Sequence, residues 1–136
     1  MNKFAFTCGD VNGIGPEIAI KALNKICNLN KSSRFVLIIP KNIFEITSKL
    51  IQPKFGYEIA SKINSIKSTS SQVLIILTKS VRQTLGKPTS ESGKAAFNAL
   101  KISFELLKYS GFHAIVTAPV SKTALKLAGV KYPGQT

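Results

Sequence analysis

Residues 7–17 bring glycines, acidic side chains and a proline together directly after an apolar run. The segment reads TCGDVNGIGPE, and Phe4-Ala5-Phe6 precedes it. Pro16 stands where the first residue of a helix tolerates a missing backbone N–H. The segment therefore predicts a strand, a loop and a helix start within a few residues. Ligands of α/β proteins collect at such junctions, at the carboxyl ends of the strands.

Two interpretations of this loop remain open. A helix N-terminus can bind phosphate through its free N–H groups, but Glu17 lies in the first turn and would itself satisfy the helix dipole. The glycine spacing is not that of a dinucleotide fingerprint, and no acidic residue stands about 20 positions further on. The loop is therefore either part of a ligand site or a structural turn whose glycines allow positive φ.

A second motif, residues 117–122 (TAPVSK), follows a short apolar run. Its polar groups are expected at the same edge of the sheet, where Thr117, Ser121 and Lys122 could together hold an anionic group. The alternative is a helix N-terminus with an exposed lysine.

Cysteine and histidine are scarce. Cys8 and Cys27 are too few for a disulfide framework, and their spacing matches no zinc motif. We expect two reduced thiols near the core. With His113 as the only histidine, this chain alone is expected to hold no metal site.

The net charge of +13 suggests nucleic acid as a partner. However, Arg34 and Arg82 are the only arginines, and the lysines are dispersed without a run of four. We therefore expect only weak, non-specific binding that salt abolishes. No apolar stretch approaches the roughly 20 residues of a membrane span, and no secretory signal follows Lys3, so a cytoplasmic location is expected.

Apolar runs alternate with segments of helical periodicity, and most runs lack a polar face. This pattern predicts an α/β fold with a mainly parallel sheet, helices on both faces and right-handed crossovers. Residues 52–71 are polar and weakly patterned, and no element is predicted there. The predicted strands are 4–8, 35–39, 73–77 and 114–117, and the predicted helices are 16–27, 42–50, 92–109 and 121–128.

The longest predicted helix has two features of its own. Ser90 or Ser92 can cap its N-terminus. One of its faces carries apolar side chains, the arrangement of an amphipathic helix; these are Phe97, Leu100, Phe104 and Leu107.

Taken together, these segments resemble one family. Residues 7–17 resemble the signature T-x-G-D-P-x-G-I-G-P-E of the PdxA-type 4-hydroxythreonine-4-phosphate dehydrogenases. Residues 114–122, 128–130 and 133–136 resemble that family's block A-[IL]-V-T-[AG]-P-[VI]-x-K, A-G-[IV] and G-H-T-E, and residues 92–96 resemble the helix start before it. The resemblance covers the whole chain in the right order.

The resemblance implies an incomplete fold of the isocitrate/isopropylmalate dehydrogenase type, with residues 1–136 as its N-terminal part. It implies a homodimer that oxidises 4-phosphooxy-L-threonine with decarboxylation, using NAD or NADP and a divalent metal (Zn, Mg or Co). It places Gln135 and Thr136 at the substrate, with Lys122 and Asp10 as further candidates at the edge of the site. It assigns no catalytic residue or metal ligand to this chain and leaves the cofactor contacts unknown.

The chain departs from the family pattern at three positions. Val11 replaces a proline, His113 stands where aspartate is common, and Gln135 replaces a histidine. Family members are more than twice as long, and their three metal-binding histidines follow the G-H-T-E motif. The 136-residue chain alone is therefore expected to be inactive. The alternative functions are a small basic nucleic-acid-binding α/β domain and a non-catalytic remnant that still dimerises.

Overall fold

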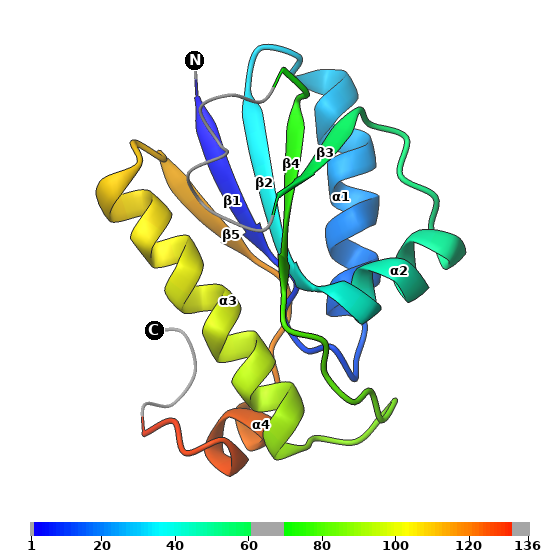
Figure 1. Cartoon of the computed structure of the whole chain (residues 1–136), viewed down its shortest axis with the longest axis vertical. Helices are drawn as coiled ribbons and strands as arrows, with labels where there is room; N and C mark the ends of the chain where they lie inside the picture. Colours follow the sequence, from blue (N-terminus) through cyan, green and yellow to red (C-terminus); the bar gives the residue numbers. More distant parts are fainter. Residues whose placement is uncertain (1, 61–69, 132–136) are drawn as a thin grey trace.

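A five-stranded parallel sheet forms the centre of the computed structural model, which describes residues 2–60 and 70–131. Strands and helices largely alternate along the chain (Figure 1). The strands are β1 (Lys3–Thr7), β2 (Arg34–Pro40), β3 (Tyr57–Ala60), β4 (Val73–Thr78) and β5 (Ala114–Thr117). The helices are α1 (Gly15–Leu29), α2 (Lys41–Leu50), α3 (Ser90–Tyr109) and α4 (Lys122–Leu127).

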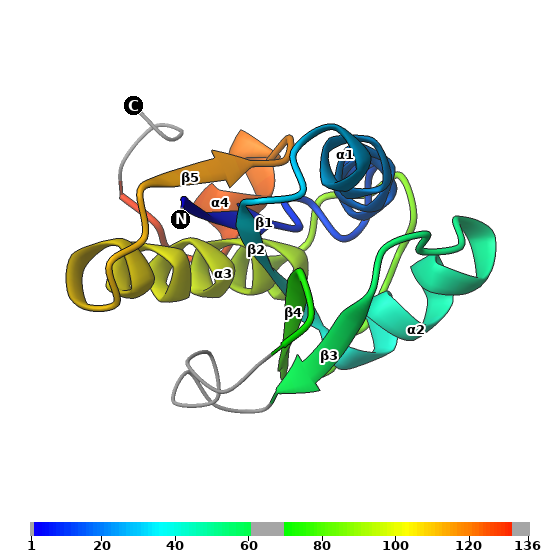
Figure 2. The ribbon, with the colours of Figure 1, turned by 90° about the horizontal axis from the view of Figure 1, so that it is seen from above.

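The strand order is β3-β4-β2-β1-β5, and every neighbouring pair is parallel. Figure 2 shows α1 and α2 on one face of the sheet and α3 on the other. This arrangement confirms the predicted α/β fold with helices on both faces. All carboxyl ends of the strands consequently lie at one edge, where the loops after β1, β4 and β5 begin.

The core is centred on β2, the middle strand. Residues 35–39 of this strand are all buried, which explains their continuous apolar run. Helix α1 contributes Ile20 and Leu23 from one side, and α3 contributes Leu106 from the other. Burying a leucine or isoleucine side chain stabilises the fold by roughly 1.5–3 kcal/mol, so this cluster is the main source of stability.

The structure differs from the predicted strands at several places. Strand β3 lies in the segment for which no element was expected; it is a short edge strand in which only Ala60 is buried, so it has no apolar run. Strand β1 ends at Thr7, one residue before the predicted end, and β2 continues through Pro40. Strand β5 was expected to be buried on both faces, but it is the other edge strand, and Val116 is 41% exposed.

The N-cap of α3 is Thr89, not Ser90 or Ser92. The Thr89 hydroxyl accepts a hydrogen bond from the Ser92 backbone N–H at 3.0 Å, and the Ser92 hydroxyl accepts one from the Thr89 N–H at 3.1 Å. This reciprocal pair is a capping box in which serine takes the place of the usual glutamate or glutamine.

Helix α3 packs on the core through Leu106 and not through its two phenylalanines. The rest of its buried face is made of smaller residues, among them Gly93, Ala96 and Ala99. Phe97 is 39% exposed and Phe104 is 60% exposed. Small side chains allow close approach of the helix to its neighbours, and the aromatic face points away from the core.

Candidate functional site

The two motif loops join at the carboxyl edge of the sheet. The Asp10 backbone N–H donates to the Pro119 carbonyl oxygen at 2.8 Å, and the Ala118 N–H donates to the Thr7 carbonyl oxygen at 3.3 Å. Gly9 has φ +68°, and a Cβ atom there would overlap the Pro119 carbonyl oxygen. Only glycine combines this backbone conformation with such a close approach of another main chain. The first loop is therefore held against the second by main-chain hydrogen bonds and by the close approach at Gly9.

Helix α1 begins directly beside this junction. Pro16 occupies one of its first positions, Glu17 lies in its first turn, and no side chain caps the N-terminus. A Cβ atom at Gly15 would overlap the Cys8 carbonyl oxygen, so the helix start packs closely against the end of β1. The Glu17 carboxylate balances the helix dipole. These features favour the structural interpretation of the α1 N-terminus over phosphate binding.

The Asp10 side chain is partly committed to holding its own loop. Its Oδ1 atom accepts a hydrogen bond from the Asn12 N–H at 3.0 Å, an Asx turn. Gly13 leaves room for the second oxygen, because a Cβ atom there would lie 3.0 Å from Oδ2. Asp10 is half-buried, so it shapes the loop while keeping one oxygen uncommitted among the described residues.

Asn12 is a residue that the sequence did not single out, and it brings a third loop to the site. Its side chain is 2% exposed. Its Nδ2 donates to the Lys87 carbonyl oxygen at 2.8 Å and to Thr89 Oγ1 at 3.2 Å, and its Oδ1 accepts from the Thr84 N–H at 2.8 Å. The loop between β4 and α3 is thereby fixed over the first motif. The sequence gives no local signal for this role, because all three partners are more than 70 residues away.

Replacing Asn12 by alanine should lower the free energy of unfolding by about 2 kcal/mol, because the hydrogen bonds of its buried side chain to Thr84, Lys87 and Thr89 would be lost. Urea denaturation at constant pH measures the change. Asn98→Ala, at an exposed position of α3, is the control and should change stability by less than about 0.5 kcal/mol. Equal effects of the two substitutions would contradict the bridging role.

The second motif places Lys122 in the first turn of α4. Ser121 caps this helix, since its hydroxyl accepts a hydrogen bond from the Ala124 N–H at 3.1 Å. Lys122 is exposed, and so is Thr117 at the end of β5. Helix α4 is seated on α3 at Gly93, where any Cβ atom would overlap the Ala124 carbonyl oxygen. Of the three side chains that were predicted to hold an anionic group together, Ser121 is therefore already used as the helix cap.

The remaining predicted substrate contacts, Gln135 and Thr136, lie outside the described residues. Among the residues that are described, Asp10 lies in the first loop, which is in direct backbone contact with the second, and Lys122 begins the helix that follows the second loop. Thr7, at the end of β1, is 1% exposed, and its hydroxyl has no hydrogen-bond partner within the described ranges. The edge therefore carries the Asp10 carboxylate and the buried Thr7 hydroxyl, and Lys122 lies exposed on the adjoining helix.

Both cysteines are free and buried. Burial raises the pKa of the Cys8 thiol from 9.0 to about 12, and the charge of Asp10 adds to the shift. Burial likewise raises the pKa of Cys27 to about 11. A thiol with a raised pKa is protonated at neutral pH and is neither a good nucleophile nor a metal ligand. Cys8 is therefore a packing residue within the first motif.

The raised pKa of the Cys8 thiol predicts that the folded chain loses stability at alkaline pH. Above pH 9 the unfolded chain releases the thiol proton while the folded chain retains it up to about pH 12. The stabilisation is complete below pH 9 and decreases as the pH rises, by at most about 1.4 kcal/mol per pH unit. Between pH 9 and pH 10, the free energy of unfolding should fall less in Cys8→Ala than in the unmodified chain. Identical slopes would contradict the assignment.

A metal site does not fit the described residues, since they contain no group of three or more histidine, cysteine, aspartate or glutamate side chains. His113 lies at the amino end of β1, where its Nδ1 accepts a hydrogen bond from the Lys3 N–H at 3.1 Å and its own N–H donates to the Lys3 carbonyl oxygen at 2.8 Å. His113 is therefore at the opposite edge of the sheet from the motif loops.

Within the described residues, no helix is long and apolar enough to span a membrane.

Comparison with known proteins gives consistent matches. The family model of the pyridoxal phosphate biosynthetic protein PdxA matches residues 29–136. D-threonate 4-phosphate dehydrogenase of Salmonella typhimurium is 32% identical over 97% of this chain and 41% of the relative. The 4-hydroxythreonine-4-phosphate dehydrogenase of Zymomonas mobilis is 36% identical over 100% of the chain and 39% of the relative. The chain thus spans about two-fifths of the length of these relatives.

The solved structures agree with the sequence matches. The crystal structure of 4-hydroxythreonine-4-phosphate dehydrogenase from Klebsiella pneumoniae superimposes with a TM-score of 0.80 at 27% identity, covering 99% of this chain and 42% of that one. The matched family model extends over more than half of the chain, and the solved structures share the fold of this chain. The chain therefore belongs to the PdxA family of pyridoxal phosphate biosynthetic proteins.

Proposed function

We propose that this chain is the N-terminal part of a dehydrogenase that acts on a 4-phosphorylated threonine or a closely related hydroxy acid. The observation that supports the proposal most directly is the backbone junction between the two family motifs, Asp10 N–H to Pro119 carbonyl and Ala118 N–H to Thr7 carbonyl. The junction lies where ligands of open α/β sheets bind. The relatives' names share the 4-phosphate group and differ in threonine or threonate as the parent compound.

The chain's own groups would recognise the ends of such a substrate. The exposed Lys122 ammonium is suited to an anionic group, as a compact point charge. The free oxygen of Asp10 could accept a hydrogen bond from a hydroxyl or ammonium group. Gln135 and Thr136 would complete the contacts, with Gln135 donating a neutral hydrogen bond where the family uses histidine. A neutral donor binds a phosphate dianion more weakly than a charged one.

Other parts of the proposal follow from family membership. NAD or NADP would accept the hydride, and the protein would orient the substrate for it. A divalent metal (Zn, Mg or Co), a homodimeric assembly and a cytoplasmic location belong to the same proposal. Among the described residues, no three histidine, cysteine, aspartate or glutamate side chains come together.

The substrate contact can be tested by NMR titration of the isotopically labelled chain with 4-phosphooxy-L-threonine. We expect amide shifts in residues 8–13 and 117–122, and a several-fold weaker dissociation constant in Lys122→Gln. Lys126→Gln is the matched control, because Lys126 is an exposed lysine of the same short helix. Shifts elsewhere, or an equal effect of both substitutions, would overturn the assignment.

The 136-residue chain should form no NADH from NAD and 4-phosphooxy-L-threonine, and equilibrium dialysis should find no stoichiometric zinc. One histidine and two buried thiols cannot supply a three-histidine site. Absorbance at the NADH band measures turnover, with a full-length relative as the positive control. Turnover by the purified chain would refute this expectation.

The alternative of a nucleic-acid-binding domain has the net charge of +13 in its favour. The arginines give it little further support. The Arg34 guanidinium donates to the carbonyl oxygens of Ser70 and Ser71 and so serves the fold. We therefore keep the dehydrogenase proposal and expect DNA binding to be weak and abolished by salt.

A further inference from the structure

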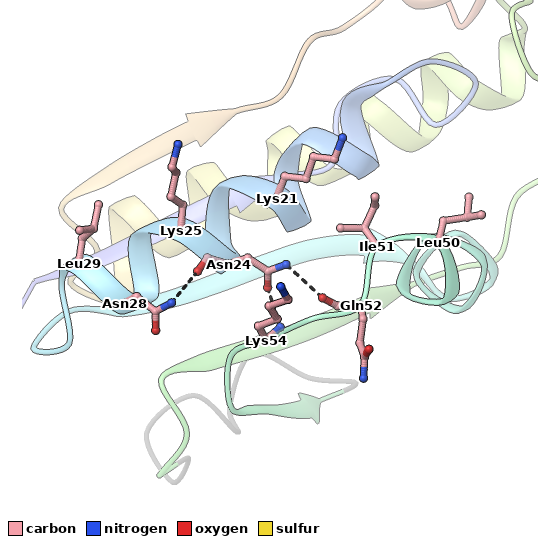
Figure 3. A pocket seen from close by; sticks show the side chains of 9 residues that line it. All are labelled: Lys21, Asn24, Lys25, Asn28, Leu29, Leu50, Ile51, Gln52 and Lys54. Atoms are coloured by element: carbon pink, nitrogen blue, oxygen red, sulfur yellow. Dashed lines mark hydrogen bonds between the residues drawn. The ribbon is translucent and has the colours of Figure 1, made fainter.

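A second concave surface lies away from the motif loops, between α1 and the segment that follows α2. This basic groove, of about 770 Å³, runs beside residues 21–29 of α1 and residues 50–54 (Figure 3). The candidate functional site lies instead at the N-terminus of α1. The groove is therefore a separate feature, and the inference from it is independent of the proposed dehydrogenase activity.

The charge of the groove has one sign. Lys21 and Lys25 line it from α1, and Lys54 lines it from the opposite wall, whereas no aspartate or glutamate is among its lining residues. Within residues 2–60 and 70–131, these three lysines form no ion pair. Lys21 and Lys25 are four residues apart, so they project from the same side of the helix. The groove thus presents three uncompensated positive charges to a single ligand.

The walls of the groove are held together by one side chain. Asn24 Nδ2 donates to the Gln52 carbonyl oxygen at 3.1 Å, and Asn24 Oδ1 accepts from the Lys54 N–H at 2.6 Å. Figure 3 shows these bonds running from α1 to the opposite wall, below Lys21 and Lys25 in this view. Because both bonds use main-chain groups of the second wall, the groove is formed before any ligand arrives.

Apolar side chains stand at the two ends of the groove. Leu29 is 79% exposed at one end, and Leu50 is 67% exposed at the other, beside the half-buried Ile51. Figure 3 shows the lysines between them. An occupant that matches this surface has apolar groups at both ends and carboxylates between them. An amphipathic helix binds a groove in this manner.

We propose that the basic groove binds an acidic, amphipathic segment of another protein, with apolar side chains on Leu29 and Leu50 and carboxylates near Lys21, Lys25 and Lys54. A second copy of this face is disfavoured, because a two-fold contact would bring six lysines together. Single-stranded nucleic acid is disfavoured because no aromatic side chain lines the groove for base stacking. A flat anionic membrane fits a concave surface poorly.

The test uses a fluorescent synthetic helix with leucines on one face and glutamates beside them. Labelled chain should show amide shifts confined to residues 21–29 and 50–54. The triple variant K21E/K25E/K54E should bind the peptide about tenfold more weakly by fluorescence anisotropy, because three attractive charges become repulsive. Leu29→Ser combined with Leu50→Ser should also weaken binding.

The matched control is K94E/K101E/K108E, which makes the same change of net charge on exposed lysines of α3. It should change the dissociation constant by less than about twofold, and thermal unfolding should verify that both triple variants fold. Equal weakening by the two triple variants would show attraction to net charge alone and would overturn the proposal. Equal binding of polyglutamate, or tighter binding of anionic vesicles at the same residues, would also overturn it.

Discussion

Replacing Gly9 by alanine should lower the free energy of unfolding by about 2–5 kcal/mol and separate the two motif loops. A left-handed backbone costs a residue with a Cβ atom roughly 1–2 kcal/mol, and Gly9 has φ +68°. In addition, the new methyl group would overlap the Pro119 carbonyl oxygen and lie 2.9 Å from that of Ala118. These atoms belong to main chain, so relief requires a shift of the second loop, and overpacking of this kind typically costs about 1–3 kcal/mol more.

The substitution Gly111→Ala separates the cost of the left-handed backbone from the cost of the steric overlap. Gly111 has a similar φ of +72°, but a Cβ atom there would have nothing within 4 Å. We expect this control to lose only the backbone contribution, about 1–2 kcal/mol. Urea denaturation gives both values, and amide shifts of residues 117–122 report the displacement of the second loop. If the two alanine variants were equally stable, the close contact between the loops would be disproved.

The sequence alone predicted the sheet well where burial dominates the choice of residues. Residues 35–39 and 73–77 are apolar at every position because β2 and β4 lie inside the sheet. The sequence did not predict β3, because this edge strand packs with only one buried side chain, Ala60. An apolar pattern records burial, so an exposed strand paired through its main chain leaves little trace.

Helix α3 shows a second reason for failure. Phe97, Leu100, Phe104 and Leu107 suggested the packing face. Leu107 does pack partly against the core, but Ala96, Ala99 and Leu106 form the buried face, and Phe97 and Phe104 are exposed. The distance between a helix and its neighbours determines which side chain sizes fit, and periodicity alone does not contain that distance.

The candidate site was predictable in its two sequence motifs and not in its third loop. Glycine and proline punctuation located residues 7–17 and 117–122, and the parallel topology brings their loops to one edge. Asn12 was missed because its partners, Thr84, Lys87 and Thr89, are more than 70 residues away. Long-range hydrogen bonds of a single amide have no local signature in the sequence.

Gly93→Ala should destabilise the chain by about 3 kcal/mol, against the usual trend for helices. In an open helix position, alanine is favoured over glycine by about 1 kcal/mol. Gly93 is buried in α3, however, and a Cβ atom there would overlap the Ala124 carbonyl oxygen and lie 3.0 Å from the Ala128 Cβ. Helix α4 would have to move away from α3, and the first turn that carries Lys122 would move with it.

Lys94→Ala, one position further along α3 at an exposed site, is the neighbouring control and should change stability by less than about 0.5 kcal/mol. Thermal and urea unfolding give the stabilities, and amide shifts of residues 121–128 give the displacement of α4. Under the proposed function, in which Lys122 of α4 contacts the substrate, the same substitution should also weaken the binding of 4-phosphooxy-L-threonine more than its effect on the folded fraction accounts for. A stabilised Gly93→Ala variant with unchanged α4 shifts would show that α4 does not rest on this glycine, and the structural basis for placing Lys122 at the site would be lost.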